Sequence, residues 1–255
     1  MKIIFPMSAI PRILGPILLL FVMTGVLGAN VAHADPWVLD GVGTRGCGTT
    51  FCSSQVLTTA RGHDVVVLTF ECVGGYTPCD ASGINITDSN GLTFTQRISV
   101  VQLFEYYAVA TAPLRSDNIT VVVADHFILG MQVLAIHGSN GRSIFDPNPS
   151  IPATVSCNGL CEDCSASLQN GTCSASIQTS TIDFVVATTE IGDAPGCGDA
   201  IGVVVVPGFT NVAVNGRFEV DYAITTKPQS NIVFSCSSTD VAAILVDAIS
   251  IQSAV

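Results

Sequence analysis

Three acidic residues in apolar, strand-like stretches are the first candidates for chemistry. Glu105 and Glu219 follow Phe104 and Phe218 in two similar segments, so they occupy equivalent places. A pair of carboxyl groups is what most glycoside hydrolases use as acid and base. Strict strand alternation points both side chains away from the core, so we expect a solvated strand face there rather than a catalytic pair.

Asp247 is a different case because it interrupts an apolar run, where the related segment holds Leu134. A buried carboxylate needs a partner or a raised pKa, and such groups cluster at functional sites. Pairing with an arginine or with backbone amides is the interpretation we favour. A carboxylate-dependent extracellular hydrolase using Asp247 or Glu105 is the enzymatic alternative, and a non-enzymatic protein is favoured over it.

Ten cysteines are the second chemical feature, and we expect them to form up to five disulfides in an oxidising compartment. They are Cys47, Cys52, Cys72, Cys79, Cys157, Cys161, Cys164, Cys173, Cys197 and Cys236. The sequence does not fix their connectivity. Close spacing suggests local loops and elimination leaves one longer loop: Cys47–Cys52, Cys72–Cys79, two pairs within 157–173, and Cys197–Cys236.

Metal binding is the rival interpretation of the cysteine cluster. Cys157, Cys161, Cys164 and Cys173 supply four thiolates within 17 residues, a number that suits zinc or an iron–sulfur cluster. Their spacing matches no established zinc or cluster motif, and the compartment argument favours disulfides.

The remaining motifs are weak. No ligand or triad motif includes the histidines of the exported part, His63, His126 and His137. Residues 88–91 (Asp-Ser-Asn-Gly) favour a hairpin turn over a calcium loop, and Glu190, Asp193 and Asp199 favour an acidic surface loop over a calcium site. We therefore predict no catalytic residue, no metal and no cofactor.

Composition and the amino terminus indicate export. The 255 residues are 48% hydrophobic and 11% charged, with a net charge of −11, which excludes a disordered chain and disfavours nucleic acid as a partner. Lys2 and Arg12 precede an apolar run at 13–28, and Ala32-His33-Ala34 follows. This pattern predicts a signal peptide over 1–34, with an uncleaved anchor as the alternative. The run is short for a membrane span and contains Gly15 and Pro16, so we expect no stable span in the mature form.

The rest of the chain predicts an all-β fold built from an internal duplication. Short runs of Val, Ile, Thr and aromatic residues recur between turn residues, with little helical periodicity. Segments match in order at offsets between 113 and 119, beginning with 64–71 against 183–190. We expect a disulfide-stapled β-sandwich or jelly roll, as one sandwich or two domains. Its predicted parts are an N-terminal strand segment at 35–55, repeat 1 at 56–137, a cysteine-rich connector at 138–176 and repeat 2 at 177–255.

Strand patterns also predict which faces are covered. The apolar stretches 65–70 and 241–251 lack alternation, so they should be buried on both faces. In 217–224 we expect Phe218, Val220, Tyr222 and Ile224 inward and the residues between them outward. Glycosylation sequons begin at Asn85, Asn118 and Asn170, and the first two asparagines should face solvent.

Four stretches resemble a group of secreted prokaryotic duplicated β-sandwich proteins of unassigned function. They are 91–97 (Gly-Leu-Thr-Phe-Thr-Gln-Arg), 105–110 (Glu-Tyr-Tyr-Ala-Val-Ala), 113–121 (Pro-Leu-Arg-Ser-Asp-Asn-Ile-Thr-Val) and 145–149 (Phe-Asp-Pro-Asn-Pro). The resemblance covers about 55–250 and implies export and duplicated β-structure. Its motifs are strand and turn motifs and carry over no site, and the cysteine-rich connector departs from it.

The sequence thus favours a secreted or cell-surface protein with a structural or adhesive role, partnered by itself or by other surface proteins. Trp37, Val38 and Leu39 mark a candidate assembly strand, which in a filament would complete a neighbour's sheet. The alternative is that this segment is the first edge strand of its own sheet. A glycan-binding module is the second functional candidate, with Trp37, Tyr76, Tyr106 and Tyr107 as stacking residues.

Overall fold

The computed structural model describes residues 38–44, 52–74, 79, 81–141, 143–157, 173–191, 197, 208–215, 218–236 and 241–251. Regular structure in these ranges is β-strand apart from one 3-10 turn, η1 (Ala81–Gly83), so the predicted all-β class is confirmed. No helix within these ranges has the length and apolarity that a membrane crossing requires.

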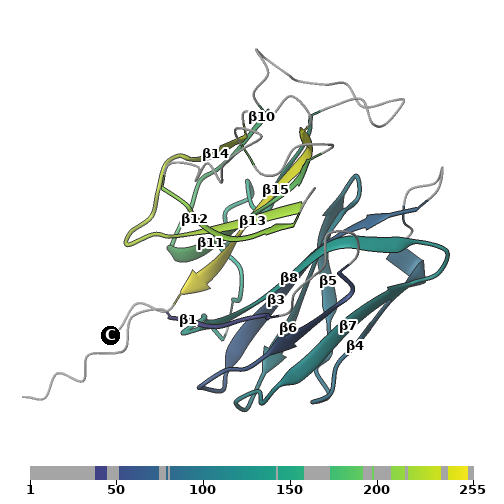
Figure 1. Cartoon of the computed structure of the whole chain (residues 1–255). Coiled ribbons are helices and arrows are strands. Elements are labelled where there is room, and N and C mark those ends of the chain that lie inside the picture. The colour runs from purple at the N-terminus through teal and green to yellow at the C-terminus, as the bar shows by residue number, and fades with distance from the viewer. Residues whose placement is uncertain are drawn as a thin grey trace, which may run out of the picture. The chain divides into compact units, whose positions relative to one another are not determined.

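The first half of the chain forms a sandwich of two antiparallel sheets (Figure 1). The strands of its large sheet, in spatial order, are β1 (Val38–Val42), β8 (Phe127–His137), β3 (Asp64–Val73), β6 (Leu103–Ala110) and β5 (Thr95–Val100). Those of its small sheet are β2 (Ser54–Leu57), β7 (Asp117–Val123) and β4 (Ile84–Thr87).

The second half repeats this plan. The strands of its large sheet, in spatial order, are β12 (Thr210–Asn215), β13 (Phe218–Ile224), β11 (Ile182–Ile191), β15 (Val241–Ile251) and β9 (Ala153–Ser156). The described strands of its small sheet are β10 (Cys173–Ile177) and β14 (Ile232–Cys236). The central strand β11 lies between β13 and β15 as β3 lies between β6 and β8, which confirms the predicted duplication.

The edge strands β1 and β9 occupy equivalent places in the two large sheets. β1 pairs with β8, joining Leu39 to Ile136, and β9 pairs with β15, joining Thr154 to Leu245. The predicted assembly segment therefore lies, at Val38 and Leu39, in an edge strand of its own sheet, while Trp37 is outside the described residues. Within the predicted connector, β9 belongs to the second sandwich.

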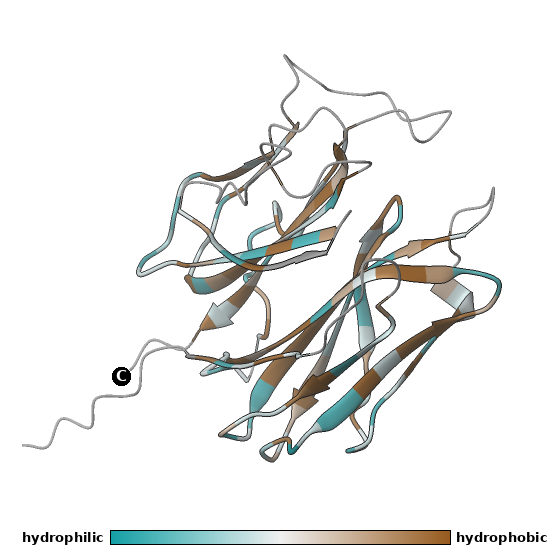
Figure 2. Ribbon diagram, in the orientation of Figure 1, coloured by the Kyte–Doolittle hydropathy of each residue, from teal (hydrophilic) through white to brown (hydrophobic). Residues whose placement is uncertain are grey.

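Each sandwich encloses its own core between its large and small sheets, and a third core joins the two large sheets. In this third core Val65, Val67 and Leu134 of the first half cluster with Phe184 and Leu245 of the second. The large sheets therefore have both faces covered. The prediction that 65–70 and 241–251 are buried on both faces is confirmed, and Figure 2 shows these central strands as mainly hydrophobic.

Equivalent strands meet across this third core in both directions. β6 contacts β15 as β13 contacts β8, and β5 contacts β15 as β12 contacts β8. The junction of the two large sheets thus follows the symmetry of the duplication. We refer to it below as the junction.

Disulfides staple both sandwiches. Cys72–Cys79 and Cys197–Cys236 are paired as predicted, and Cys157 pairs with Cys173. Cys52 is also disulfide-bonded, whereas Cys47, Cys161 and Cys164 lie outside the described residues. Because Cys157 and Cys173 form a disulfide, the alternative of a metal site with four thiolates at 157–173 is wrong.

The close approach of the two sheets can be tested at Gly130 of β8. A methyl group at this position would overlap the side chain of Phe218 in β13. We expect Gly130→Ala to lower the free energy of unfolding by about 1–3 kcal/mol, because a packed interior resists added volume. Denaturant unfolding measures the change. Gly141→Ala is the matched control, since a methyl group there meets open space, and an equal effect of both substitutions would contradict the tight junction.

Candidate functional site at the junction

Asp247 lies fully buried in the middle of β15 and faces the first sandwich. Strand alternation places it on the same face as Leu245 and Ile249, which belong to the third core. The register confirms its equivalence to Leu134, since Val186 pairs with Asp247 as Val67 pairs with Leu134. One repeat therefore holds a carboxylate where the other holds a methyl-rich side chain.

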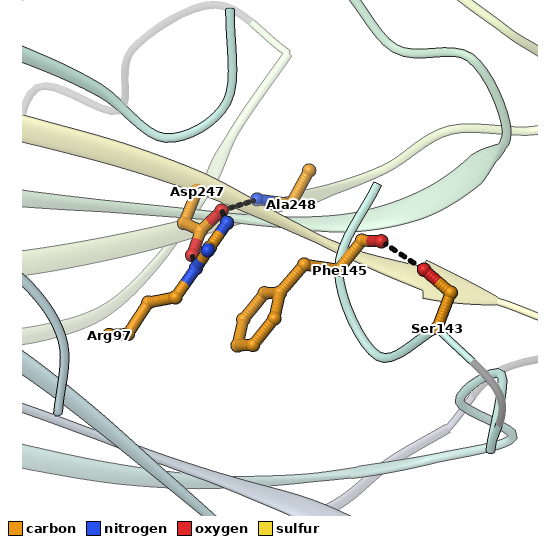
Figure 3. A network of polar contacts seen from close by, with 5 residues as sticks. All are labelled: Arg97, Ser143, Phe145, Asp247 and Ala248. Carbon is orange, nitrogen blue, oxygen red and sulfur yellow. Dashed lines mark hydrogen bonds and ion pairs between the residues drawn. The ribbon is translucent and has the colours of Figure 1, made fainter. Parts of the chain in front are cut away.

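Arg97 of β5 is the partner of Asp247. Its Nε donates to Oδ2 at 2.7 Å and its Nη2 donates to Oδ1 at 3.3 Å (Figure 3). The backbone amide of Ala248 donates to Oδ1 at 2.8 Å. The predicted pairing of Asp247 with an arginine and with a backbone amide is confirmed. A two-point contact of this kind orients the guanidinium as well as neutralising the carboxylate.

A β-bulge aims Arg97 at its partner. The register between β5 and β6 shifts between Gln96 and Ile98, so Arg97 is the extra residue on its strand. Bulges re-aim side chains in this way. The shift explains why an arginine in an edge strand reaches across the junction to a residue 150 positions away.

The ring of Phe145 packs against the guanidinium of Arg97 in this ion pair. The guanidinium carbon of Arg97 lies 3.9 Å from the centre of the Phe145 ring, a cation–π arrangement. Tyr107 meets the same ring edge-on, with ring centres 5.0 Å apart. The backbone near Phe145 is fixed by a bridge to Ile249 and by Ser143, whose Oγ donates to the Phe145 carbonyl at 2.9 Å (Figure 3).

Glu105 of β6 faces the same ion pair from the first sandwich. Its side chain is fully buried, and burial is the main cause that raises its pKa well above the ordinary range. The nearby Asp247 carboxylate raises this pKa further, while Arg97 opposes the shift. A protonated Glu105 can donate a hydrogen bond to Asp247, whereas an ionised one would repel it.

The expectation that Glu105 and Glu219 face solvent is wrong. Both are fully buried, because the second face of each large sheet is covered as well as the first. The two residues are also not equivalent. Glu105 pairs with Thr69 of β3, whereas the counterpart of Thr69 in β11, Thr188, pairs with Val220.

Strand β13 shows the same departure from simple alternation. Phe218 and Val220 are inward as predicted, but Glu219 and Asp221 are fully buried on the opposite face. There the Cys197 amide donates to Glu219 Oε2 at 2.6 Å and Asn211 Nδ2 donates to Asp221 Oδ1 at 3.2 Å. Ile224, expected inward, is 41% exposed.

The other predicted candidates have local roles. Asp88 Oδ1 accepts hydrogen bonds from the amides of Asn90 and Leu92. The predicted hairpin turn at 88–91 is wrong, because this segment connects β4 to β5, which pair with β7 and β6 in different sheets. His137 Nδ1 contacts Asp64 Oδ1 at 2.8 Å, and His126 Nδ1 contacts the Ala124 carbonyl at 2.7 Å. Across the described ranges, no group of three or more His, Cys, Asp or Glu side chains is placed to hold a metal ion. Asp193 and Asp199 lie outside those ranges.

Two predicted surface features can be located. Asn85 and Asn118 are exposed, as expected of the first two sequons, and Asn170 lies outside the described residues. Tyr106 is buried and stacked on Phe70, and Tyr107 packs on Phe145. These two tyrosines therefore serve the interior, while Trp37 and Tyr76 lie outside the described residues.

The junction joins residues that the sequence analysis did not combine. Arg97, Glu105 and Phe145 all fall within the stretches that carry the resemblance to secreted β-sandwich proteins. Their place in these stretches was the one feature of the sequence that could have drawn attention to them together. Comparison of the chain with protein-family models, with curated proteins and with solved structures finds no match. The resemblance stays a prediction.

The ion pair can be tested by placing at Asp247 the leucine that the first repeat has at the equivalent position, Leu134. We expect Arg97→Met to lower the free energy of unfolding by about 2–4 kcal/mol, because it leaves Asp247 buried without its cation. The loss should be smaller than for an enclosed pair, since the Arg97 side chain keeps 22% of its exposure. Adding Asp247→Leu, which copies Leu134, should recover most of it.

Denaturant unfolding of the two single variants and the double variant completes the thermodynamic cycle. The exposed Arg115, changed to Met, is the control for loss of an arginine as such. Additive effects of Arg97→Met and Asp247→Leu would show that the two side chains are not coupled.

Proposed function

We propose that the protein is an exported structural or adhesive protein whose two sandwiches act as one rigid body. The observation that carries this proposal is the closed junction. Glu105 and Asp247, the two carboxyl groups that the hydrolase alternative would use, lie fully buried between the large sheets. Arg97 is bound to Asp247 and covered by Phe145. Groups held in this way connect two sheets rather than meet a substrate.

The disulfides support an exterior location. Three pairs among the described residues, Cys72–Cys79, Cys157–Cys173 and Cys197–Cys236, fit an oxidising compartment. They restrain loops or edges of both sandwiches, which suits a protein that must persist outside a cell without a chaperone system. Exposure of Asn85 and Asn118 allows glycans at both sites if the host supplies them.

Two hollows in the described surface are lined by residues other than the junction carboxyl groups. One of about 330 Å³ is lined by residues of β13 and β14 and by Phe209. Another of about 210 Å³ is lined by residues of β7 and β8. Neither includes Glu105 or Asp247.

Self-association through β1 is the filament form of the proposal. In the single chain β1 occupies the edge of β8, as β9 occupies the edge of β15. Filament growth would use the same β1–β8 register between copies, by exchange of the edge strand. The backbone hydrogen bonds would be the same in both arrangements, so exchange needs only that the connection between β1 and β2 be long enough to reach a neighbour.

Electron microscopy of the secreted full-length chain tests this proposal. We expect ordered filaments, and we expect deletion of residues 35–42 to abolish them while circular dichroism and disulfide content remain those of a folded β-protein. Monomeric particles from the full chain would contradict the filament form. Filaments that persist after the deletion would show that β1 is not the exchanged strand.

A further inference from the structure

Many acidic side chains are buried in the part of the chain that the structure describes. The sequence has 20 Asp and Glu residues, and ten of them are buried in the described ranges: Asp64, Glu71, Glu105, Asp117, Asp146, Asp183, Glu190, Glu219, Asp221 and Asp247. No Lys or Arg is among the buried residues of those ranges. An ionised carboxylate is costly to bury without a cation or several hydrogen bonds. The stability of the fold therefore depends on which of these carboxyl groups carry a proton.

At the junction, Glu105 is a carboxyl group that is buried without hydrogen-bond donors. Neither of its carboxyl oxygens has a hydrogen-bond donor. The charged groups that face it are Asp247 from β15 and Arg97 from β5, and Arg97 is already bound to Asp247. One guanidinium thus serves two carboxyl groups, which fits only if one of them carries a proton.

Asp183 is the corresponding case at the start of β11. Thr181 Oγ1 donates to its Oδ1 at 2.8 Å, but its Oδ2 is buried without a donor. The ionisable group facing it is Asp146, and burial is the largest cause that raises the pKa of Asp183 to about 7. The carboxylate of Asp146 has its own donors, the amides of Ser180 and Thr181.

Asp221 of β13 repeats the pattern on the same face of the second large sheet, since its pairing partner Ala187 shares a face of β11 with Asp183. Its Oδ2 is buried without a donor, and the ionisable group beside it is Glu219. Burial, followed by the interaction with Glu219, raises the pKa of Asp221 to about 8, against a smaller effect of Asn211.

Asp64 of β3, the repeat counterpart of Asp183, has a histidine as the partner of one of its carboxyl oxygens. His137 from β8 contacts its Oδ1, yet Oδ2 has no donor and Asp40 from β1 faces it. Burial is again the largest cause that raises the pKa of Asp64. Asp40 is only partly buried, so the buried acid pairs lie in the second sandwich and at the junction, while in the first sandwich a buried acid faces a partly exposed one.

We propose that the folded protein is stabilised by protons on these buried carboxyl groups, and is therefore built for acidic surroundings, with a junction that weakens as the pH rises. The proposal concerns the conditions in which the fold persists and does not depend on what the protein assembles with. Each buried acid pair holds together while one member is neutral and repels when both are ionised.

The direction of the pH dependence follows from the sign of the shifts. A carboxyl group whose pKa is higher in the folded state than in the unfolded state stabilises the fold fully below its unfolded pKa, and this stabilisation is lost as the pH rises through the folded pKa. For Asp183 and Asp221 the interval runs from about 4 to about 7 and about 8. Within it each group lowers the folding equilibrium constant about tenfold per pH unit.

The experiment measures denaturant unfolding of the full disulfide-bonded chain between pH 4 and pH 9. We expect the folding equilibrium constant to fall at least about tenfold per pH unit between pH 5 and pH 7. The variants Glu105→Gln, Asp183→Asn and Asp221→Asn keep the shape of each group without its titration. Each should reduce the slope, and the triple variant should lose most of it.

Asp125→Asn is the matched control. Asp125 is exposed and adopts a positive φ of 60°, which asparagine also tolerates, so this substitution should leave the slope unchanged. Stability that is constant from pH 4 to pH 8, or that falls toward acid, would overturn the proposal. So would a slope that survives in a folded triple variant.

Calorimetry of the wild-type chain gives a second test that needs no variant. Unfolding at pH 6 in buffers of different ionisation enthalpy reports the protons exchanged with solvent. We expect a net release, because the folded state holds protons that the unfolded carboxyl groups do not. Net uptake, or no exchange, would contradict the proposal even if the variants fail to fold.

Discussion

Burial of the second face of each large sheet is the constraint on which the rest of the structure depends. The strands β3 and β15 are buried along both faces, so neither large sheet can leave one side in water. The duplicated chain resolves this by placing the two large sheets against each other, with equivalent strands meeting in both directions. Each half thus supplies the cover that the other lacks.

Polar groups within this junction follow from the same constraint. Leu134 and Val220 fill their places in the junction with apolar side chains. The repeat counterpart of Leu134 is Asp247, and that of Val220 is Glu105. A carboxyl pair in such a place requires a cation and a proton. The bulge in β5 supplies the cation by aiming Arg97 across the junction. Burial keeps the proton on Glu105. The two repeats therefore differ in this junction, where one has apolar side chains and the other an oriented polar contact, which adds specificity more than stability.

Much of this fold was predictable from local patterns. The β class, the duplication, the doubly buried strands and the pair Cys72–Cys79 follow from periodicity and spacing. The pair Cys197–Cys236 follows by elimination once the close pairs are assigned. The faces of Glu105 and Glu219 did not, because alternation assigns a residue to a face without saying what covers that face. Arg97 could not be chosen as the partner of Asp247 because a one-residue register shift and a contact over 150 positions decide it. Asp247 itself was identifiable, since a charge in an apolar strand requires a partner wherever the strand lies.

The central claim is that the junction makes the two sandwiches one cooperative body. Native-state hydrogen exchange of the full chain tests it most directly, by comparing the amides of β3 with those of β11, the equivalent central strands. We predict that both sets exchange only through global unfolding and report the same free energy. Exchange of one set through an opening of markedly lower free energy, while the other stays protected, would show two independent sandwiches and would contradict the account.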